Sequence, residues 1–350
     1  MKTNTTANEE KIAMFAATAM SLEVSSYPKP GNVHRLKDFK ETTFEHFLIS
    51  ALSAISVFLK APHSDSKTND FGSLFYEAVL KSQCFQSGGN THFGTLILLL
   101  PLSMAAGLVF NDEKGNSSEK TAKKVIEKAA DICKKTTVED AIGFYKAFEM
   151  SNVSVQKIGN GRSENKTIFA NSKSSNLTNS KTLDSTNSKA FDLTNSNAVE
   201  NIQSLKTSLF DLMKRGAQRD MIAKEWVTGF EKSALFSKKL IENKRFFEKN
   251  PKKCYGSFIN SAVVYTFMEF LAEFEDTFIM TKFNQKKASK IRMKASKIIK
   301  KDNGKRNLIK MIPKIQQLDR KMQKDKINPG SLADIAAAGI FISLLDGMAI

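Results

Sequence analysis

The sequence predicts an all-α fold, a multi-helix bundle-like single core with a disordered polar insertion. Apolar residues recur at three- and four-residue steps, as over 44–59, where Phe44, Phe47, Leu48 and Ala51 would share one helix face. We find no set of alternating strands with hairpin turns. At 350 residues, with 41% hydrophobic and 25% charged side chains, the chain can bury a sizeable core.

Helices are expected wherever this periodicity recurs. Two of them begin with capping-box spacing, one at Thr42 and Glu45 and one at Thr137 and Asp140. In chain order the expected helices are 8–25, 44–59, 72–86, 91–110, 118–134, 137–148, 200–214, 219–247, 256–275, 285–301, 305–325 and 331–346.

The most apolar run, Leu96–Phe110, holds 15 residues and includes Pro101. It is too short to span a bilayer, so we expect a buried helix and no membrane partner. The cysteines show neither CxxC nor metal-finger spacing, and their sparse, odd count suits a reducing compartment. We therefore expect a cytoplasmic protein with three free cysteines, Cys84, Cys133 and Cys254.

The middle of the chain has a different composition. Between Ala170 and Asn197 an octad repeats Asn-Ser-Lys or Asn-Ser-Asn. A few short polar repeats cannot bury a core, so 159–200 is expected to be a low-complexity disordered insert. It would separate an N-terminal helical half, 1–150, from a C-terminal half, 201–350.

The net charge of +17 is concentrated in one segment. Residues 282–326 contain 17 Lys or Arg and three Asp or Glu. Such an excess suggests nucleic acid, an anionic membrane surface or polyanionic small molecules. The segment has helical apolar spacing, one aromatic residue (Phe283) and no known DNA-binding helix motif. We therefore expect mostly solvated lysine faces and disfavour nucleic acid as the partner.

A first unusual segment is 27–35, YPKPGNVHR, followed by Asp38. Two prolines and a glycine would fix a rigid loop. Lys29 and Arg35 are cations that can hold phosphates, whereas His34 and Asp38 can move protons or hold a metal. The alternative is a polar turn between helices.

A second segment, 87–94, reads SGGNTHFG and precedes the apolar helix. Gly88 and Gly89 would let backbone N–H groups approach an anion at the helix N-terminus. Asn90 or Thr91 could instead simply cap the helix. The spacing is not that of a Walker A loop.

Two further segments lie in the C-terminal half. In 275–282, EDTFIMTK, Asp276 is expected at a helix end, where the dipole disfavours a carboxylate. It would therefore hold a metal or a sugar hydroxyl, with Lys282 meeting a phosphate; the alternative is a solvated helix end. In 328–334, NPGSLAD, Ser331 and Asp334 have capping-box spacing, which is an adequate structural explanation.

Taken together, these segments resemble the triphosphoribosyl-dephospho-CoA synthase family. Residues 23–35 are similar to its E-V-x-x-x-P-K-P-G-x-V signature, and 88–94 to G-G-x-N-T-H-x-G with one residue fewer. Residues 276–282 resemble D-T-x-x-x-R/K, and 328–334 match N-P-G-x-x-A-D. The order and approximate spacing agree, and the resemblance covers about 20–150 and 205–346.

The resemblance implies an all-α enzyme that moves the 5-triphosphoribosyl group of ATP to the ribose 2′-hydroxyl of 3′-dephospho-CoA and releases adenine. ATP would be a substrate and Mg²⁺ a cofactor. The catalytic candidates are His34, Asp38, His92 and Asp276, and the metal candidates are Asp276 and Asp334. The substrate-binding candidates are Lys29, Gly31, Arg35, Gly88, Gly89, Asn90, Thr91, Lys282, Asn328, Gly330 and Ser331.

The sequence departs from the family at one place. Bacterial members usually have Asp where His34 stands, followed by a G-A-H-x-D-M element, and here 37–42 read KDFKET. An alternative is therefore an ATP-using enzyme on the same scaffold that has another acceptor or only hydrolyses the nucleotide. The alternative from another class is a basic helical nucleic-acid-binding protein. The oligomeric state stays open.

Overall fold

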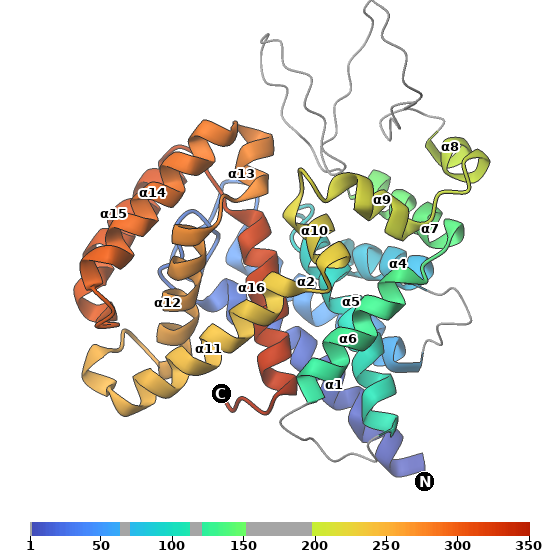
Figure 1. Cartoon of the computed structure of the whole chain (residues 1–350), viewed down its shortest axis with the longest axis horizontal. Coiled ribbons are helices and arrows are strands. Elements are labelled where there is room, and N and C mark those ends of the chain that lie inside the picture. Colours follow the sequence, from blue (N-terminus) through green and yellow to red (C-terminus); the bar gives the residue numbers. More distant parts are fainter. Residues whose placement is uncertain (1, 64–70, 113–120, 152–197) are drawn as a thin grey trace, which may run out of the picture.

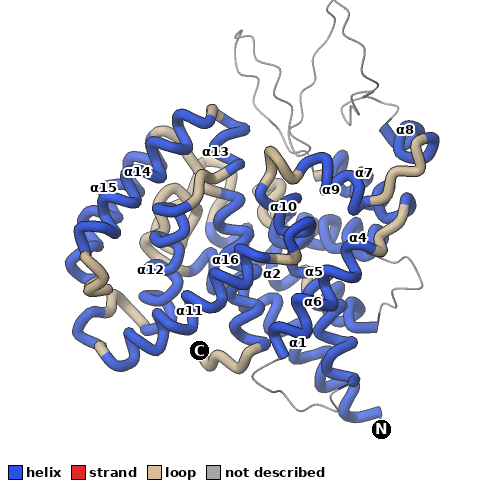
Figure 2. The backbone as a smooth tube through the Cα atoms, viewed as in Figure 1, coloured by secondary structure: helices blue, strands red, loops and turns tan. Residues whose placement is uncertain are grey.

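The structure is a computed structural model, and it describes residues 2–63, 71–112, 121–151 and 198–350. These ranges fold into helices joined by loops (Figures 1 and 2). They contain no strand, only an isolated bridge between His34 and Lys37. The all-α prediction is confirmed. Of the disordered insert expected over 159–200, residues 159–197 with the octad repeat lie outside the described residues, and 198–200 belong to a helix.

Most helices lie close to the expected ranges, but the single helices expected over 44–59 and 200–214 are each two, and the short helix Thr277–Lys282 was not expected. In chain order they are α1 (Lys2–Ser25), α2 (Phe44–Ser53), α3 (Ile55–Lys60), α4 (Phe71–Cys84), α5 (Phe93–Asp112), α6 (Thr121–Lys134), α7 (Val138–Met150), α8 (Ala198–Ser204), α9 (Leu209–Gly216), α10 (Met221–Thr228), α11 (Glu231–Lys249), α12 (Phe258–Glu273), α13 (Thr277–Lys282), α14 (Gln285–Asp302), α15 (Leu308–Lys324) and α16 (Gly330–Leu345), with short 3₁₀ turns at Ala61–His63 and Pro251–Lys253.

Helices α5 and α16 form the centre of the core. Helix α16 packs on α1 and α5 from the N-terminal part of the chain and on α11 and α12 from the C-terminal part (Figure 1). The buried apolar side chains of both parts form one cluster. The predicted single core is therefore confirmed.

Two segments of the described chain are long and apolar enough to pass as membrane spans, Phe44–His63 and α5. Helix α5 has 20 residues, five more than the apolar run that predicted it. Of its most apolar window 89% is buried inside the protein, so its composition follows from its place in the core. The first segment is interrupted at Ala54, where α2 ends and α3 begins.

The single helix expected over 219–247 is in fact two. Gly229 and Phe230 both adopt left-handed backbone conformations, with φ of 70° and 61°, and these end α10 and turn the chain into α11. The buried carboxylate of Glu225 accepts the backbone N–H groups of Lys232 (3.0 Å) and Ser233 (2.8 Å). A residue of one helix thus satisfies the free N-terminus of the next.

Helix starts confirm one of the two predicted capping boxes. Thr137 and Asp140 exchange the expected bonds at the start of α7. The other prediction was wrong by one residue, because α2 is capped by Thr43, whose N–H donates to His46 Nδ1 at 3.0 Å. Thr42 instead donates its hydroxyl to the carbonyl of Gly88 (3.0 Å) and so ties the loop before α2 to the turn before α5.

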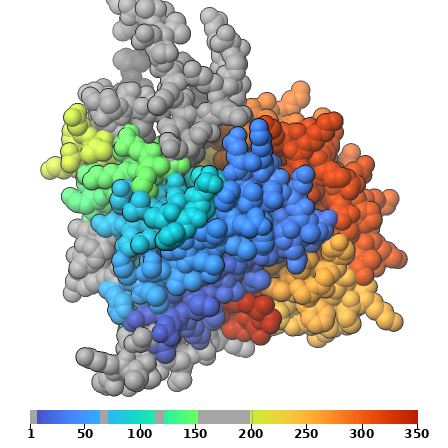
Figure 3. All heavy atoms as spheres, turned by 180° about the vertical axis from the view of Figure 1, so that it is seen from behind, coloured from blue at the N-terminus to red at the C-terminus, as the bar shows by residue number. Residues whose placement is uncertain are grey.

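The basic segment forms the antiparallel pair α14 and α15. Many of its apolar residues are buried, among them Ile291 and Ile315, while Met293 and Ile309 are exposed, as are lysines such as Lys297 and Lys310. The amphipathic helices expected there are confirmed. Seen from behind, the orange-red surface of these helices adjoins the blue surface of the N-terminal segments (Figure 3).

We expect Gly229→Ala to lower the free energy of unfolding by about 1 kcal/mol, because φ here is one that a Cβ disfavours. An added Cβ would meet only the side chain of Ala130 at 3.6 Å, so the loss comes from the backbone. Gly229→Asn is the control, since asparagine tolerates this conformation better. Urea unfolding checks both variants, and equal losses would contradict the backbone explanation.

Candidate active site

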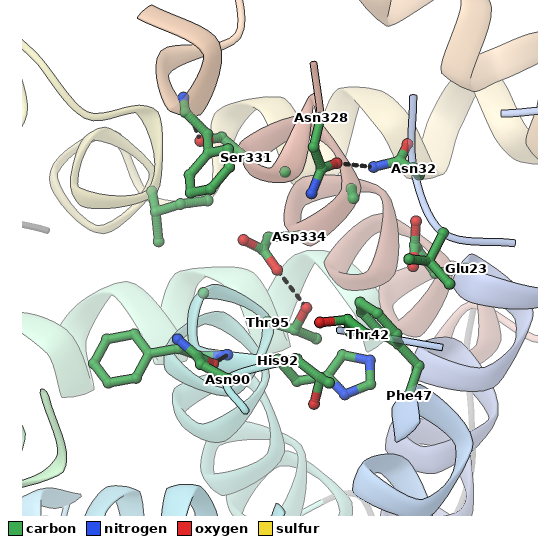
Figure 4. Close-up of a pocket in the computed structure, with 18 of the residues that line it drawn as sticks. Glu23, Asn32, Thr42, Phe47, Asn90, His92, Thr95, Asn328, Ser331 and Asp334 are labelled. Carbon is green, nitrogen blue, oxygen red and sulfur yellow. Dashed lines mark hydrogen bonds between the residues drawn. The ribbon is translucent and has the colours of Figure 1, made fainter. Parts of the chain in front are cut away.

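One cavity gathers residues that are far apart in the sequence. It lies between the loop after α1, the turn before α5, the start of α10 and the start of α16 (Figure 4). Its polar and charged lining includes Glu23, Asn32, Asn90, His92, Asp220 and Asp334. Aromatic walls come from Phe39, Phe47, Phe93, Phe148 and Phe278. A hollow that combines apolar walls with convergent polar groups is typical of a small-molecule site.

Asp334, near the start of α16, points toward Thr95 of α5 (Figure 4). The Thr95 hydroxyl donates to its Oδ1 at 2.6 Å. Burial raises the pKa of Asp334 to about 8, and the charges of Glu23, Asp276 and Asp220 add to the rise. A Cβ at Gly94 would collide with Asp334 Oδ2, so only glycine leaves the carboxyl in this place.

Two more carboxyl groups line the cavity. Asp220 caps α10, accepting the N–H groups of Ile222 (2.8 Å) and Ala223 (2.9 Å), and burial raises its pKa to about 6. Glu23 forms an ion pair with the fully buried Lys29. Burial raises the pKa of the Glu23 carboxyl, while the Lys29 ammonium opposes that rise. Lys29 thus lies behind the cavity wall, where it supports Glu23.

His92 is buried, with Nδ1 lying 2.9 Å from the hydroxyl of Ser50. Burial, together with the charge of Lys29, lowers the pKa of His92 to about 3, so its imidazole is neutral at pH 7. Within the described part of the chain its Nε2 has no hydrogen-bond partner. This nitrogen is therefore available to a ligand.

Two asparagines close another side of the cavity. The side-chain amide of Asn32 donates to Asn328 Oδ1 at 2.8 Å, and its own Oδ1 is buried without a partner among the described residues (Figure 4). Gln323 Nε2 donates to the backbone carbonyl oxygen of Asn32 at 2.6 Å and holds the loop in place. The unpaired side-chain oxygen, Asn32 Oδ1, marks a place where a hydrogen-bond donor or a cation would be stabilised.

The sequence matches the ATP:dephospho-CoA triphosphoribosyl transferase family over residues 9–349. The chain belongs to this family. The family inferred from the four motifs is thereby confirmed. Among curated proteins no match is found. A solved structure from Archaeoglobus fulgidus, provisionally assigned as a triphosphoribosyl-dephospho-CoA synthase, has 23% sequence identity and a TM-score of 0.56, over 86% of this chain and 99% of that chain. At this identity the likeness shows a shared fold.

Asp276, a predicted catalytic and metal residue of this family member, does not line the cavity. It lies at the N-terminus of α13, not at a helix C-terminus as expected, and its Oδ1 accepts the N–H of Ile279 at 2.9 Å. Its Oδ2 accepts the N–H of Leu332 at 2.8 Å, so one buried carboxyl holds the starts of α13 and α16 together. Burial raises the pKa of Asp276 to about 7.

Ser331 and Asp334 do not form the capping box that their spacing predicted. The Ser331 hydroxyl accepts the N–H of Phe278 (3.2 Å) and lies 3.1 Å from the Thr277 hydroxyl, while Asp334 bonds Thr95. Both side chains are turned to other helices, and Ser331, Asn328 and Gly330 all line the cavity. Residues 328–334 therefore link α16 to α13 and α5, whereas the sequence predicted only a cap of the helix itself.

The predicted functional residues His34, Arg35 and Asp38 do not line the cavity. His34 Nε2 lies 3.2 Å from Asp319 Oδ2, and Arg35 donates to Asn260 Oδ1 at 2.6 Å. Asp38, in the loop before α2, accepts the backbone N–H of Phe44, the first residue of α2, at 2.8 Å. The backbone N–H of Gly31 donates to Asp319 Oδ1 at 2.9 Å. These residues fix the loop rather than face the cavity.

The glycine turn shapes the cavity without lining it. Gly88 packs on His46, and Gly89 has a φ of 72°. Asn90 accepts the N–H of Phe93 at 3.0 Å and so caps α5. Asn90 and Thr91 both line the cavity. Lys282 lies outside the cavity lining, and burial together with the charge of Lys326 lowers its pKa.

Several cavity residues had no role in the sequence interpretation: Glu23, Asn32, Thr95, Asp220, and Ser50 behind His92. Glu23 and Asn32 stand inside the first motif, which gave a signal for them. Asp220 and Thr95 carry no such signal, because an Asp before a helix and a Thr in an apolar helix are both ordinary. Only the folded arrangement brings them together.

We expect Asp276→Ala to lower the free energy of unfolding by about 2 kcal/mol, because two buried N–H groups lose their acceptor. Asn284→Ala is the matched control, an exposed cap that accepts one N–H, from Lys287 at 2.8 Å, and it should cost about 1 kcal/mol. Chemical denaturation measures both. An Asp276→Ala loss no larger than that of the control would contradict the clamp.

Stability should fall as pH rises from about 5 to 8.5. The folded protein binds a proton at Asp334 more tightly than the unfolded chain, because its pKa is about 8 when folded, against the ordinary aspartate value of 3.8. We expect the fall in Tm between pH 5 and 8.5 to be smaller in Asp334→Asn than in the wild type, by about 3 °C or more. In Asp211→Asn the decline should stay as in the wild type, because Lys214 lowers the pKa of that exposed carboxyl. Parallel curves for the wild type and Asp334→Asn would refute this assignment.

Proposed function

We propose that the protein transfers the 5-triphosphoribosyl group of ATP to the 2′-hydroxyl of 3′-dephospho-CoA and releases adenine. Membership of the family supports the transfer in general. The observation that carries the proposal is the cavity in which Glu23, Asp220 and Asp334 face a common space beside His92. We expect the reaction to take place in the cytoplasm, which suits three free cysteines.

The reaction breaks the bond between ribose C1′ of ATP and adenine and forms a bond from C1′ to the acceptor oxygen. The bonding electrons leave with adenine, and the hydroxyl proton of the acceptor balances that charge. As the bond breaks, C1′ gains oxocarbenium character, which an adjacent carboxylate stabilises. Glu23 and Asp220 suit this role because Lys29 and two helix N–H groups, respectively, favour their charged forms.

Asp334 suits the role of the base that takes the proton from the acceptor hydroxyl. Its pKa of about 8 allows it to gain and lose a proton near neutral pH, which favours general acid–base catalysis. The Thr95 hydroxyl occupies Oδ1, so Oδ2 is the oxygen left for the acceptor.

His92 acts by hydrogen bonding, since at a pKa of about 3 it carries no positive charge at pH 7. If the Ser50 hydroxyl donates to Nδ1, the proton of the ring sits on Nε2. That N–H would donate to a nitrogen of the departing adenine. His92 would thus replace a hydrogen bond from water that adenine loses on entering the cavity.

Mg²⁺ fits the donors of the cavity only as an ion that arrives with the nucleotide. The described residues contain no group of three or more His, Cys, Asp or Glu able to hold a metal. The oxygens present are those of Asp220, Asp334 and the unpaired Asn32 Oδ1. One or two carboxylates plus substrate phosphates are a common Mg²⁺ environment, in which the ion neutralises phosphate charge. Asp276 offers no free oxygen and is left out of this set.

The second candidate is the same chemistry with another acceptor, or with water. Residues 37–42 replace the element that bacterial members usually have, and Phe39 and Thr42 of this stretch line the cavity. Different side chains at the cavity wall are a reason to test more than one acceptor.

The test incubates the protein with ATP, Mg²⁺ and 3′-dephospho-CoA and follows free adenine and the triphosphoribosyl adduct by mass spectrometry. We expect both products, and Asp334→Asn should lower kcat by about 100-fold or more, in the range of a lost general base. Asp211→Asn, at a carboxyl on α9 that does not line the cavity, should leave kcat unchanged.

Each contrary outcome has its own meaning. Adenine without an adduct indicates nucleotide hydrolysis, and an adduct only with another CoA-type acceptor indicates the second candidate. Absence of adenine with every CoA-type acceptor would remove the transferase proposal altogether.

A further inference from the structure

A second hollow, an open groove, lies on the other side of the loop after α1. Its walls are residues 34–40 and the C-terminal half of α15. Five cations line it, two from the loop and three from α15 and the residues after it: Lys37, Lys40, Arg320, Lys324 and Lys326. All five side chains are exposed.

The groove cations outnumber its carboxylates, five against two, Asp38 and Asp319. Among the described residues none of the five forms an ion pair. The two acids of the groove are held by other partners, Asp38 by the N–H of Phe44 and Asp319 by Gly31 and His34, and their charges offset only part of the five positive ones. The concentration of unpaired positive charge therefore remains available to an anion.

Helix geometry explains only part of this charge. Lysines at the C-terminus of α15 are favoured by its dipole, which accounts for Lys324 without any ligand. Lys37 and Lys40 belong to a loop, however, and nothing in the fold requires cations there. They face Arg320 and Lys324 across the groove, an arrangement of like charges that an anion between them would stabilise.

The groove and the cavity share one wall. Phe39 lines both, and on the same loop Val33 lines the cavity while His34 lines the groove. The cavity carries carboxylates, which repel phosphate unless a Mg²⁺ ion lies between them, and the groove carries cations, which attract phosphate directly. A nucleotide with its ribose in the cavity would find a cationic surface across this loop.

We infer that the groove binds the 5′-polyphosphate chain of an adenosine nucleotide while the ribose lies in the cavity. The inference rests on the proposed function, which supplies two such chains, the triphosphate of ATP and the diphosphate of dephospho-CoA. Both present the same chemistry, several phosphates on a ribose 5′-carbon. Lys and Arg side chains bind such groups through charge-assisted hydrogen bonds.

The experiment compares two double variants with a matched control by calorimetric titration. Lys37→Ala with Lys40→Ala removes the loop cations, and Arg320→Ala with Lys324→Ala removes those of α15. The control removes two exposed lysines of the same helical pair outside the groove, Lys297→Ala with Lys310→Ala. The ligands are Mg²⁺–ATP, dephospho-CoA and inorganic tripolyphosphate.

We expect each groove variant to bind tripolyphosphate and at least one nucleotide about 10-fold or more weakly, with the control within twofold of the wild type. A loss for ATP places the triphosphate in the groove, and a loss for dephospho-CoA places the diphosphate there. Unchanged affinity for all three ligands overturns the inference. An equal loss in the control also overturns it, because attraction would then follow net charge alone.

Failure of this inference is distinguishable from failure of the proposed function. If the wild type releases adenine and forms the adduct while the groove variants bind every ligand normally, the groove assignment fails and the transferase stands. If the wild type forms no adduct but the groove variants lose tripolyphosphate, the transferase fails and the polyphosphate site stands.

Discussion

The burial of several carboxyl groups around one cavity is the constraint on which the rest of the site depends. Removing a carboxylate from water is costly unless hydrogen bonds or a counter-charge replace the solvent. An all-helical protein has such donors mainly at helix N-termini, where backbone N–H groups are free. Asp220 uses the start of α10 and Asp276 the starts of α13 and α16, whereas Glu23 uses the ammonium of Lys29. Helix starts therefore surround the cavity because its acids require them.

Asp334 is the exception among these acids. It accepts one hydroxyl, from Thr95, and no helix N-terminus or cation is assigned to it. Asp220 accepts two backbone N–H groups and has a pKa of about 6, whereas burial, with the charges of Glu23, Asp276 and Asp220, raises the pKa of Asp334 to about 8. Such a difference between neighbouring carboxyls separates a proton-transfer group from groups that stay charged. The packing that fixes the other acids thereby leaves one of them chemically free.

Periodicity predicted most helices, because burial of one face is recorded in each local stretch of sequence. The break between α10 and α11 was missed, since Phe230 adopts a left-handed conformation that its residue type does not suggest. The motifs located the cavity but not the direction of each side chain. Asp276 and Asp334 looked alike as acids near helix ends, yet one clamps two helices and the other faces the cavity. Direction is set by contacts between distant segments, which local spacing does not contain.

The net charge of +17 gives no hint that the cavity itself is acidic. The excess lies on the exposed faces of α14 and α15, at the surface, where water screens it. The carboxylates lie in a less polar interior, where each charge acts more strongly on its neighbours. One loop, with Phe39 as a common wall, separates these two fields. A ligand with a neutral sugar at one end and phosphates at the other has only one favourable direction across such a boundary, so the same loop that divides the charges can also orient the substrate.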